Sequence, residues 1–141
     1  MRFEQGDMRI ELDCLHSLTY EKNTSETLDV IEMYYWYECS EGWGSISGEY
    51  LRRDDIGQLC TGLSAVTKGK REQFEFTFDY SFYRSRAFLK LCFERTEEGF
   101  HFVLCVNDEF GDNAIDQQYT TDQWLPYLQG FIAWNSFSDQ A

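Results

Sequence analysis

The chain has little proline and no segment suited to a linker or a membrane span. Its 141 residues include a single Pro, and no run of Gly, Ser or Pro is long enough to act as a linker. No stretch approaches the roughly 18 uninterrupted apolar residues of a membrane-spanning helix. The opening residues, MRFEQGDMRIELD, carry charges where a signal peptide needs an apolar stretch. We therefore expect a single domain over residues 1–141, located in the cytoplasm and without a membrane partner.

Paired cysteines and clustered histidines are also missing. The two histidines, His16 and His101, lie in no ligand-spaced cluster. A domain of this length buries enough apolar surface to fold without disulfides or a metal. The sequence therefore predicts no metal and no cofactor, and it predicts that the five unpaired cysteines are reduced, small core residues: Cys14, Cys39, Cys60, Cys92 and Cys105.

Known catalytic motifs are absent. The chain has no Gly-rich phosphate loop with a Lys, no dinucleotide fingerprint, no Ser nucleophile elbow and no His-Glu-x-x-His pair. His101 and Cys105 share one face of a predicted strand but would lie about 13 Å apart, too far to act together. The acidic segment 107–113, NDEFGDN, departs from the calcium-loop spacing, so we interpret it as a solvated turn or a partner contact. The protein is therefore predicted not to be an enzyme.

Basic residues are missing from the last third of the chain, where no Lys or Arg follows Arg95. The net charge of −13 is unevenly distributed. Residues 1–51 contain 11 acidic and 3 basic residues, residues 52–95 contain 6 acidic and 9 basic residues, and residues 96–141 contain 8 acidic residues and no basic one. Such a charge repels nucleic acid and anionic membranes and attracts basic proteins. The sequence therefore predicts a basic protein partner and no nucleic acid, although acidity that only maintains solubility stays an alternative.

What the sequence does contain is the alternation of apolar and polar residues that is typical of strands. The clearest case is residues 73–80, QFEFTFDY, with aromatic rings on one face. Short connections favour antiparallel pairing. Similar patterns predict strands at residues 8–14, 28–39, 45–51, 86–94 and 99–106, with a short edge strand at 114–119.

Two segments have helical spacing. Residues 55–68 have an apolar stripe, with Asp55 and Gln58 placed as a capping box and Gly69 as a left-handed stop. A second helix is expected near the end of the chain, after the capping residues Thr120, Thr121 and Asp122. The fold class is thus α+β, an antiparallel twisted sheet of about six strands with two helices packed on one face. The other face of the sheet would be exposed to solvent or to a partner. It would carry Glu75, Thr77, Asp79, Lys90 and His101.

The aromatic residues 34–37, YYWY, and Trp43 have two interpretations. As core residues they would fill the space between sheet and helices, which we favour, and as surface residues they would anchor a partner. With no fringe of Arg or Lys nearby in the sequence, they do not suggest a stacking platform for nucleic acid.

The order of these segments resembles that of WapI-like immunity proteins of bacterial toxin systems. The immunity proteins of contact-dependent inhibition systems have a similar role. The resemblance rests on an opening MRIELDCL strand, an aromatic strand ending in GWGSISGEYL, a DDIGQLCTGLSAV helix and the FEFTFDY strand. It implies a protein that binds a cognate toxin, a basic one given the acidity of this chain, and occludes its active site or substrate entrance. An acidic secretion chaperone, or another protein-binding module without catalysis, is the alternative.

The candidate contact residues for such a partner are acidic and lie in predicted turns or at their borders. They are expected to speed association with a cationic surface. The set consists of Asp108, Glu109, Asp112, Asp116, Glu97 and Glu98.

Overall fold

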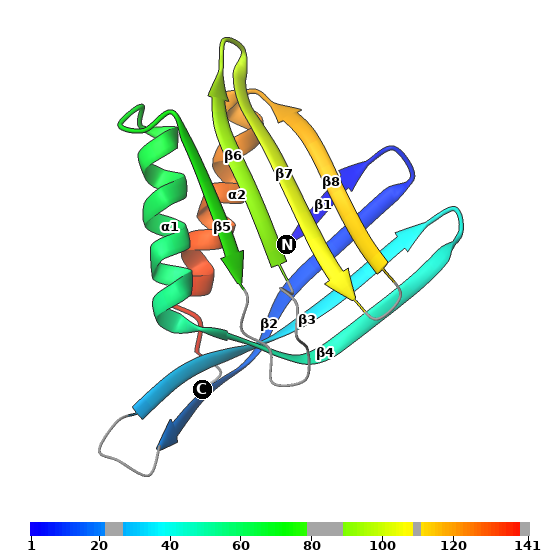
Figure 1. Ribbon diagram of the computed structural model, residues 1–141, viewed down its shortest axis with the longest axis vertical. Coiled ribbons are helices and arrows are strands. Elements are labelled where there is room, and N and C mark those ends of the chain that lie inside the picture. Colours follow the sequence, from blue (N-terminus) through cyan, green and yellow to red (C-terminus); the bar gives the residue numbers. More distant parts are fainter. Residues whose placement is uncertain (22–26, 79–88, 109–110, 139–141) are drawn as a thin grey trace.

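The chain folds into two antiparallel sheets and two helices (Figure 1). The computed structural model describes residues 1–21, 27–78, 89–108 and 111–138. Within them, four strands followed by a helix occur twice in succession, although the sequence shows no internal repeat. The first set is β1 (Arg2–Gln5), β2 (Met8–Glu21), β3 (Thr27–Cys39), β4 (Gly42–Arg52) and α1 (Arg53–Thr67), and the second is β5 (Gln73–Phe78), β6 (Leu89–Thr96), β7 (Gly99–Asp108), β8 (Gly111–Tyr119) and α2 (Thr121–Asn135).

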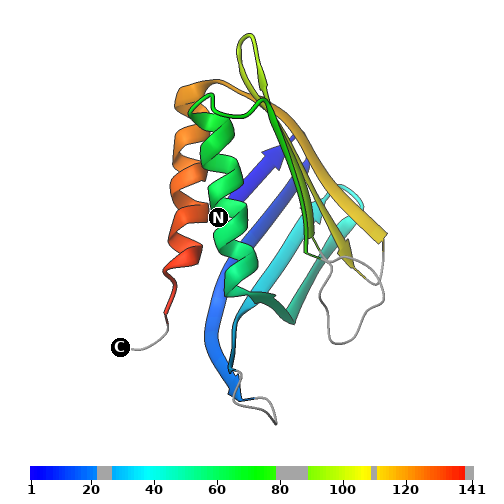
Figure 2. The ribbon, with the colours of Figure 1, turned by 60° about the vertical axis from the view of Figure 1, so that its left-hand side comes forward.

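Each sheet is a simple meander of neighbouring strands. Sheet A has the order β1-β2-β3-β4 and sheet B the order β5-β6-β7-β8. The strands of sheet A cross behind those of sheet B at a steep angle (Figure 1). The two helices lie side by side along one flank of the molecule (Figure 2). Helix α1 contacts β3 and β4 of sheet A and β5 and β6 of sheet B, so it packs against both sheets.

Helix α1 begins two residues earlier than predicted. Its N-cap is Arg52, which provides no side-chain cap, so the predicted capping box of Asp55 and Gln58 is wrong. The end of the helix matches the prediction, because Gly69 adopts a φ of 78° and its N–H donates to the carbonyl of Val66. The predicted apolar stripe is confirmed as buried at Ile56, Leu59, Cys60, Leu63 and Val66.

Helix α2 is capped by Thr120, the first of the three predicted candidates. The Thr120 hydroxyl accepts from the N–H of Gln123, and the Gln123 side chain accepts from the N–H of Thr120, which is a complete capping box. The single proline, Pro126, lies inside this helix. The N-terminal end of α1 is held to the C-terminal end of α2, since Arg53 donates to the carbonyls of Asn135 and Phe137 at 2.8 and 2.9 Å.

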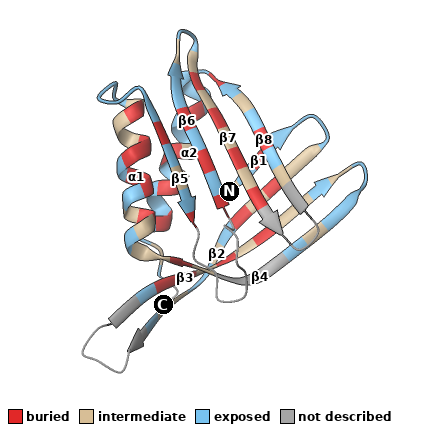
Figure 3. Ribbon diagram, viewed as in Figure 1, coloured by how far each residue is buried: buried red, intermediate tan, exposed pale blue. Residues whose placement is uncertain are grey.

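The core is a cluster of aromatic rings where the two sheets meet the helices. Phe102 of β7 lies at its centre, fully buried, with its ring centroid 5.4 Å from both Phe3 of β1 and Trp124 of α2. Trp124 is also fully buried, and its indole N–H donates to the Thr67 hydroxyl at 2.9 Å. Buried residues alternate with exposed ones along β6 and with half-buried ones along β7 (Figure 3). The core therefore joins residues from both halves of the chain.

The α+β class is confirmed, but the predicted arrangement of one sheet is wrong. The strands divide into two sheets because β4 leads into α1, and β5 then pairs with β6 instead of β4. The first strand, β1, has only four residues, too few for its alternation to be recognised in the sequence. Helix α1 packs against strands of both sheets, and α2 packs against β7 and β8 while its Tyr127 and Phe131 rings contact Phe3 of β1, so the helices do not lie on one face of a single sheet.

The cysteines depart from the predicted core role. All five are free thiols, but only Cys60 is buried, and Cys92 is exposed. Cys92 and Cys105 alternate with buried neighbours on β6 and β7, which places both on the outer face of sheet B. Alternation, and not residue type, therefore decides their exposure.

The packing around Phe102 makes a testable prediction. Phe102→Ala should lower the free energy of unfolding by about 3–5 kcal/mol, because it removes a ring contacted by five other rings and leaves a cavity. Urea-induced unfolding followed by circular dichroism measures the change. The matched control is Val103→Ala, at the next residue along β7, which is half-buried on the outer face. This substitution should lower the free energy of unfolding by less than about 1 kcal/mol. Equal losses in the two variants would contradict this placement of the core.

Candidate functional site

Strand β3 divides the aromatic run of residues 34–37 between two faces of sheet A. Tyr35 is fully buried and Tyr37 packs beside it, with ring centroids 5.7 Å apart. Tyr34 and Trp36 are half-buried and, by alternation, point to the opposite, outer face. The core interpretation is thus confirmed for Tyr35 and Tyr37, whereas Tyr34 and Trp36 lie half-buried on the outer face.

A second tryptophan joins Trp36 on this outer face. Trp43 of β4 has 69% of its surface exposed, the largest value among the exposed large hydrophobic residues described. Trp36 pairs with Ser45 and Glu38 pairs with Trp43, so the two tryptophans are diagonal neighbours across β3 and β4. Diagonal neighbours lie about 7–8 Å apart, within reach of long aromatic side chains. We call Tyr34, Trp36 and Trp43 the aromatic platform.

Gly44 of β4 is needed for the local packing. A Cβ atom on Gly44 would lie 2.5 Å from the ring of Tyr37, which covers this glycine on the inner face. Any larger residue would displace that ring. Tyr37 can therefore stay against the core while its neighbours in sequence face outward.

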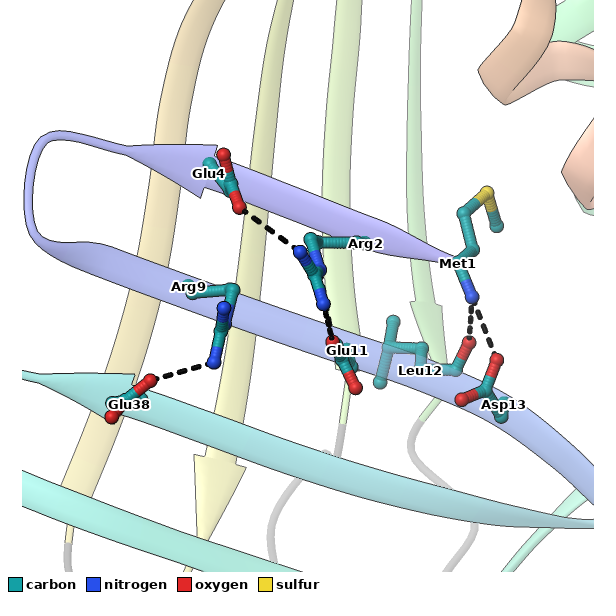
Figure 4. A network of polar contacts seen from close by, with 8 residues as sticks. All are labelled: Met1, Arg2, Glu4, Arg9, Glu11, Leu12, Asp13 and Glu38. Atoms are coloured by element: carbon teal, nitrogen blue, oxygen red, sulfur yellow. Dashed lines mark hydrogen bonds and ion pairs between the residues drawn. The ribbon is translucent and has the colours of Figure 1, made fainter.

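Arg9 lies next to the platform and Arg2 lies one strand further away, both within a network of ion pairs (Figure 4). The guanidinium of Arg9 lies 4.7 Å from the ring centre of Trp36 and 2.7 Å from the carboxylate of Glu38. Arg2 pairs with Glu11 at 2.8 Å and with Glu4 at 3.6 Å. These charges are brought together by strand pairing, since they come from β1, β2 and β3. Arg9 therefore borders the platform, which the sequence spacing did not reveal.

On the outer face of sheet B, His101 lies between two carboxylates. Its Nδ1 is 3.0 Å from Glu94 and its Nε2 is 2.6 Å from Asp116. Both ring nitrogens donate only when the imidazole is protonated. The hydrogen bond with Asp116, followed by that with Glu94, raises the pKa of His101 above its usual value. His101 thus ties β6, β7 and β8 together and is no general base for Cys105.

Polar contacts also connect the two sheets. The backbone N–H of Asp116 donates to the side chain of Gln5 at 2.7 Å, which links β8 to β1. Asn113 donates to the hydroxyl of Tyr35 at 2.9 Å, which links β8 to β3. The inner surface of sheet A is therefore held in place by sheet B, whereas Trp43 on its outer face is exposed among the described residues.

The predicted contact residues are spread over both ends of β7. Glu97 and Glu98 are exposed in the turn that precedes β7, whereas Asp108 ends that strand and Asp112 lies in β8. Glu109 lies outside the described residues. About 30 Å separates the two ends of a strand of this length. The remaining residue, Asp116, lies near the middle of β8, and its carboxylate contacts the ring of His101. The described carboxylates of the predicted set therefore do not form one site.

Other features of the described residues are less specific. A groove of about 960 Å³ lies between α1 and β5, with Asp54, Arg71, Phe74 and Phe76 among its lining residues. Among the residues that the structure describes, no three His, Cys, Asp or Glu side chains are arranged to hold a metal ion. Neither described helix, each of 15 residues, has the length and apolar composition to cross a membrane.

Comparison with known proteins places the fold. No protein-family model matches the chain, and no curated protein matches it by sequence. Solved structures with the same α+β arrangement do match over nearly the whole chain.

The three neighbours that we compared are plant proteins at low sequence identity. WHY1 from Arabidopsis thaliana has a TM-score of 0.55 and 16% identity, covering 97% of this chain and 88% of its own. The plant transcriptional regulator PBF-2 has a TM-score of 0.50 and 14% identity, covering 96% of this chain and 91% of its own. WHY3 from Arabidopsis thaliana has a TM-score of 0.51 and 14% identity, covering 96% of this chain and 85% of its own. At these identities the likeness shows the fold.

These neighbours overturn the prediction that the protein neutralises a toxin. None of the three neighbours is named as a toxin inhibitor or a secretion chaperone, and one of them is a plant transcriptional regulator, so the predicted toxin-neutralising function and the predicted basic protein partner are corrected. The exclusion of nucleic acid is wrong for the same reason. That exclusion used the charge of the whole chain, whereas binding depends on the local surface, which here presents aromatic rings and arginines.

The position of His101 predicts a pH-dependent stability. The pKa of His101 is raised in the folded protein. The contribution of protonated His101 to the free energy of unfolding is therefore complete below about pH 6.5, the pKa of an unfolded histidine, and is lost as the pH rises through the higher pKa of the folded protein. Unfolding free energies of the wild type and of His101→Gln should therefore differ most below about pH 6.5 and approach each other as the pH rises above the raised pKa of His101. A difference between the two proteins that is constant over this range would contradict the assignment.

Proposed function

We propose that the protein binds single-stranded nucleic acid on the outer face of sheet A, without catalysing a reaction. The observation that carries this proposal is the pair of tryptophans, Trp36 and the 69% exposed Trp43, presented on an open sheet beside Arg9. Bases of a single strand are unstacked and can lie against such rings. The shared fold with a transcriptional regulator supports the same class of partner.

The charge of the chain favours single strands over duplexes. Duplex binding depends on many Lys and Arg contacts with phosphates, which a net charge of −13 opposes. Stacking on aromatic rings is nearly independent of charge and contributes about 1–3 kcal/mol per base. Arg2 and Arg9 can contact the backbone, but both also pair with carboxylates. We therefore expect binding in which stacking dominates and phosphate contacts are few.

Trp43 provides the first test. Trp43→Ala should weaken binding of a thymidine dodecamer about 5- to 150-fold, because one stacking contact is lost. Fluorescence anisotropy of a labelled oligonucleotide measures the affinity. The matched control is Leu125→Ala, which removes a 39% exposed apolar residue from α2 and should leave binding unchanged. Equal effects of the two variants would show that the platform is not the binding surface.

The dependence on salt provides a second test. With about two phosphate contacts, the logarithm of the binding constant should fall with the logarithm of the salt concentration with a slope of about −1.4. Titrations at several salt concentrations measure this slope. A slope several times steeper would mean that basic segments elsewhere in the chain dominate binding. Complete failure to bind single strands at low salt would overturn the proposed function.

A further inference from the structure

We propose that Glu38 makes the aromatic platform selective for guanine. The proposal rests on the proposed function, because it identifies which base the platform accepts. It starts from four side chains on the outer face, namely Trp36 and Glu38 of β3 and Ser45 and Trp43 of β4. Since Trp36 pairs with Ser45 and Glu38 with Trp43, the tryptophans occupy one diagonal of this square and Glu38 and Ser45 occupy the other.

The spacing of this square suits one base. Diagonal neighbours in an antiparallel pair lie about 7–8 Å apart, close to twice the roughly 3.4 Å that separates stacked bases. A base between the two indole rings would stack on both of them. Its edges would then point along the other diagonal, toward Glu38 on one side and Ser45 on the other. The carboxylate of Glu38 is thus placed at the edge of the base and not against its face.

The position of Glu38 is fixed by Arg9. The guanidinium lies over the ring of Trp36 at 4.7 Å and holds one carboxylate oxygen, Oε2, at 2.7 Å. Half of the Glu38 side chain remains exposed. A carboxylate accepts about four hydrogen bonds, so it can still accept from a base. A carboxylate without a proton has no donor, so it is a pure acceptor.

Guanine is the base whose edge matches such an acceptor. Its Watson–Crick edge presents two adjacent donors, the N1–H and the exocyclic N2 amine. Adenine and cytosine place an acceptor nitrogen beside their amine, which would face the carboxylate unfavourably. Thymine has one N–H between two carbonyls. Two donors on one carboxylate form a charge-assisted bidentate contact, and the other three bases cannot form it.

Selectivity for guanine accounts for an acidic residue on a surface that binds a polyanion. A carboxylate beside the rings repels phosphates, so the strand must insert a base and keep its backbone away from Glu38. Selectivity is thereby obtained at the expense of affinity. Because the contact is half-exposed, we expect the lower end of the range for a bidentate base contact, which is about 5- to 10-fold in affinity.

The experiment compares thymidine heptamers whose central base is guanine, adenine, cytosine, thymine or hypoxanthine, which lacks the exocyclic amine. Affinity is measured by anisotropy with the wild-type protein. The guanine heptamer should bind about 5- to 10-fold more tightly than the adenine and cytosine heptamers, and the hypoxanthine heptamer should lose most of this advantage. Isolated guanines within thymidine also avoid four-stranded guanine structures.

Two variants separate Glu38 from the general charge of the face. Glu38→Gln should abolish the preference for guanine and tighten binding of the all-thymidine heptamer, because a negative charge is removed. The matched control is Glu4→Gln, which removes a carboxylate with an arginine partner from the same face, on β1, and should retain the preference. Loss of the preference in both variants would overturn the assignment to Glu38.

The outcomes for the two proposals are distinct. Equal affinity for all five heptamers would overturn selectivity for guanine while leaving the binding of single strands intact. No binding of any heptamer, or of the longer thymidine strand, would overturn the proposed function and the selectivity with it. Circular dichroism of each variant confirms that the fold is retained, so that a loss of binding is assigned to the altered side chain.

Discussion

Burial of the aromatic rings around Phe102 and Trp124 is the interaction on which the rest of the structure depends. These rings come from β1, β6, β7, β8 and α2, so neither half of the chain can complete the core alone. The hydrophobic effect favours this burial, and the antiparallel alternation of the strands decides which rings take part in it. Within the described residues, each sheet therefore has one face packed into the core and an outer face that carries exposed and half-buried side chains.

The outer faces differ in what they can do. On sheet B, His101 is occupied by Glu94 and Asp116, and this contact joins three strands. On sheet A, ion pairs also cross the strands, but they leave Trp43 exposed and hold Arg9 over Trp36. A surface with open aromatic rings can gain free energy by covering them, whereas a satisfied ion-pair network gains little.

The acidity of the chain acts on binding in a more specific way than its total suggests. A net charge of −13 opposes a partner that is recognised mainly through phosphates, but it does not oppose stacking. A carboxylate can also contribute directly when it lies at the edge of a stacked base, as proposed for Glu38. The sign of the charge thus constrains the mode of recognition and not the class of partner.

The sequence alone determined the local elements, because these depend on neighbours within a few residues. It predicted the buried stripe of α1, the alternation of β5, the stop at Gly69 and the cap at Thr120. Only the tertiary structure decided that the strands form two sheets and that Trp36, Glu38 and Trp43 share a face with Arg9. The physical reason is that strand pairing joins residues distant in sequence. Alternation places a side chain on one face of its strand, but the packing of sheets and helices determines which face is buried.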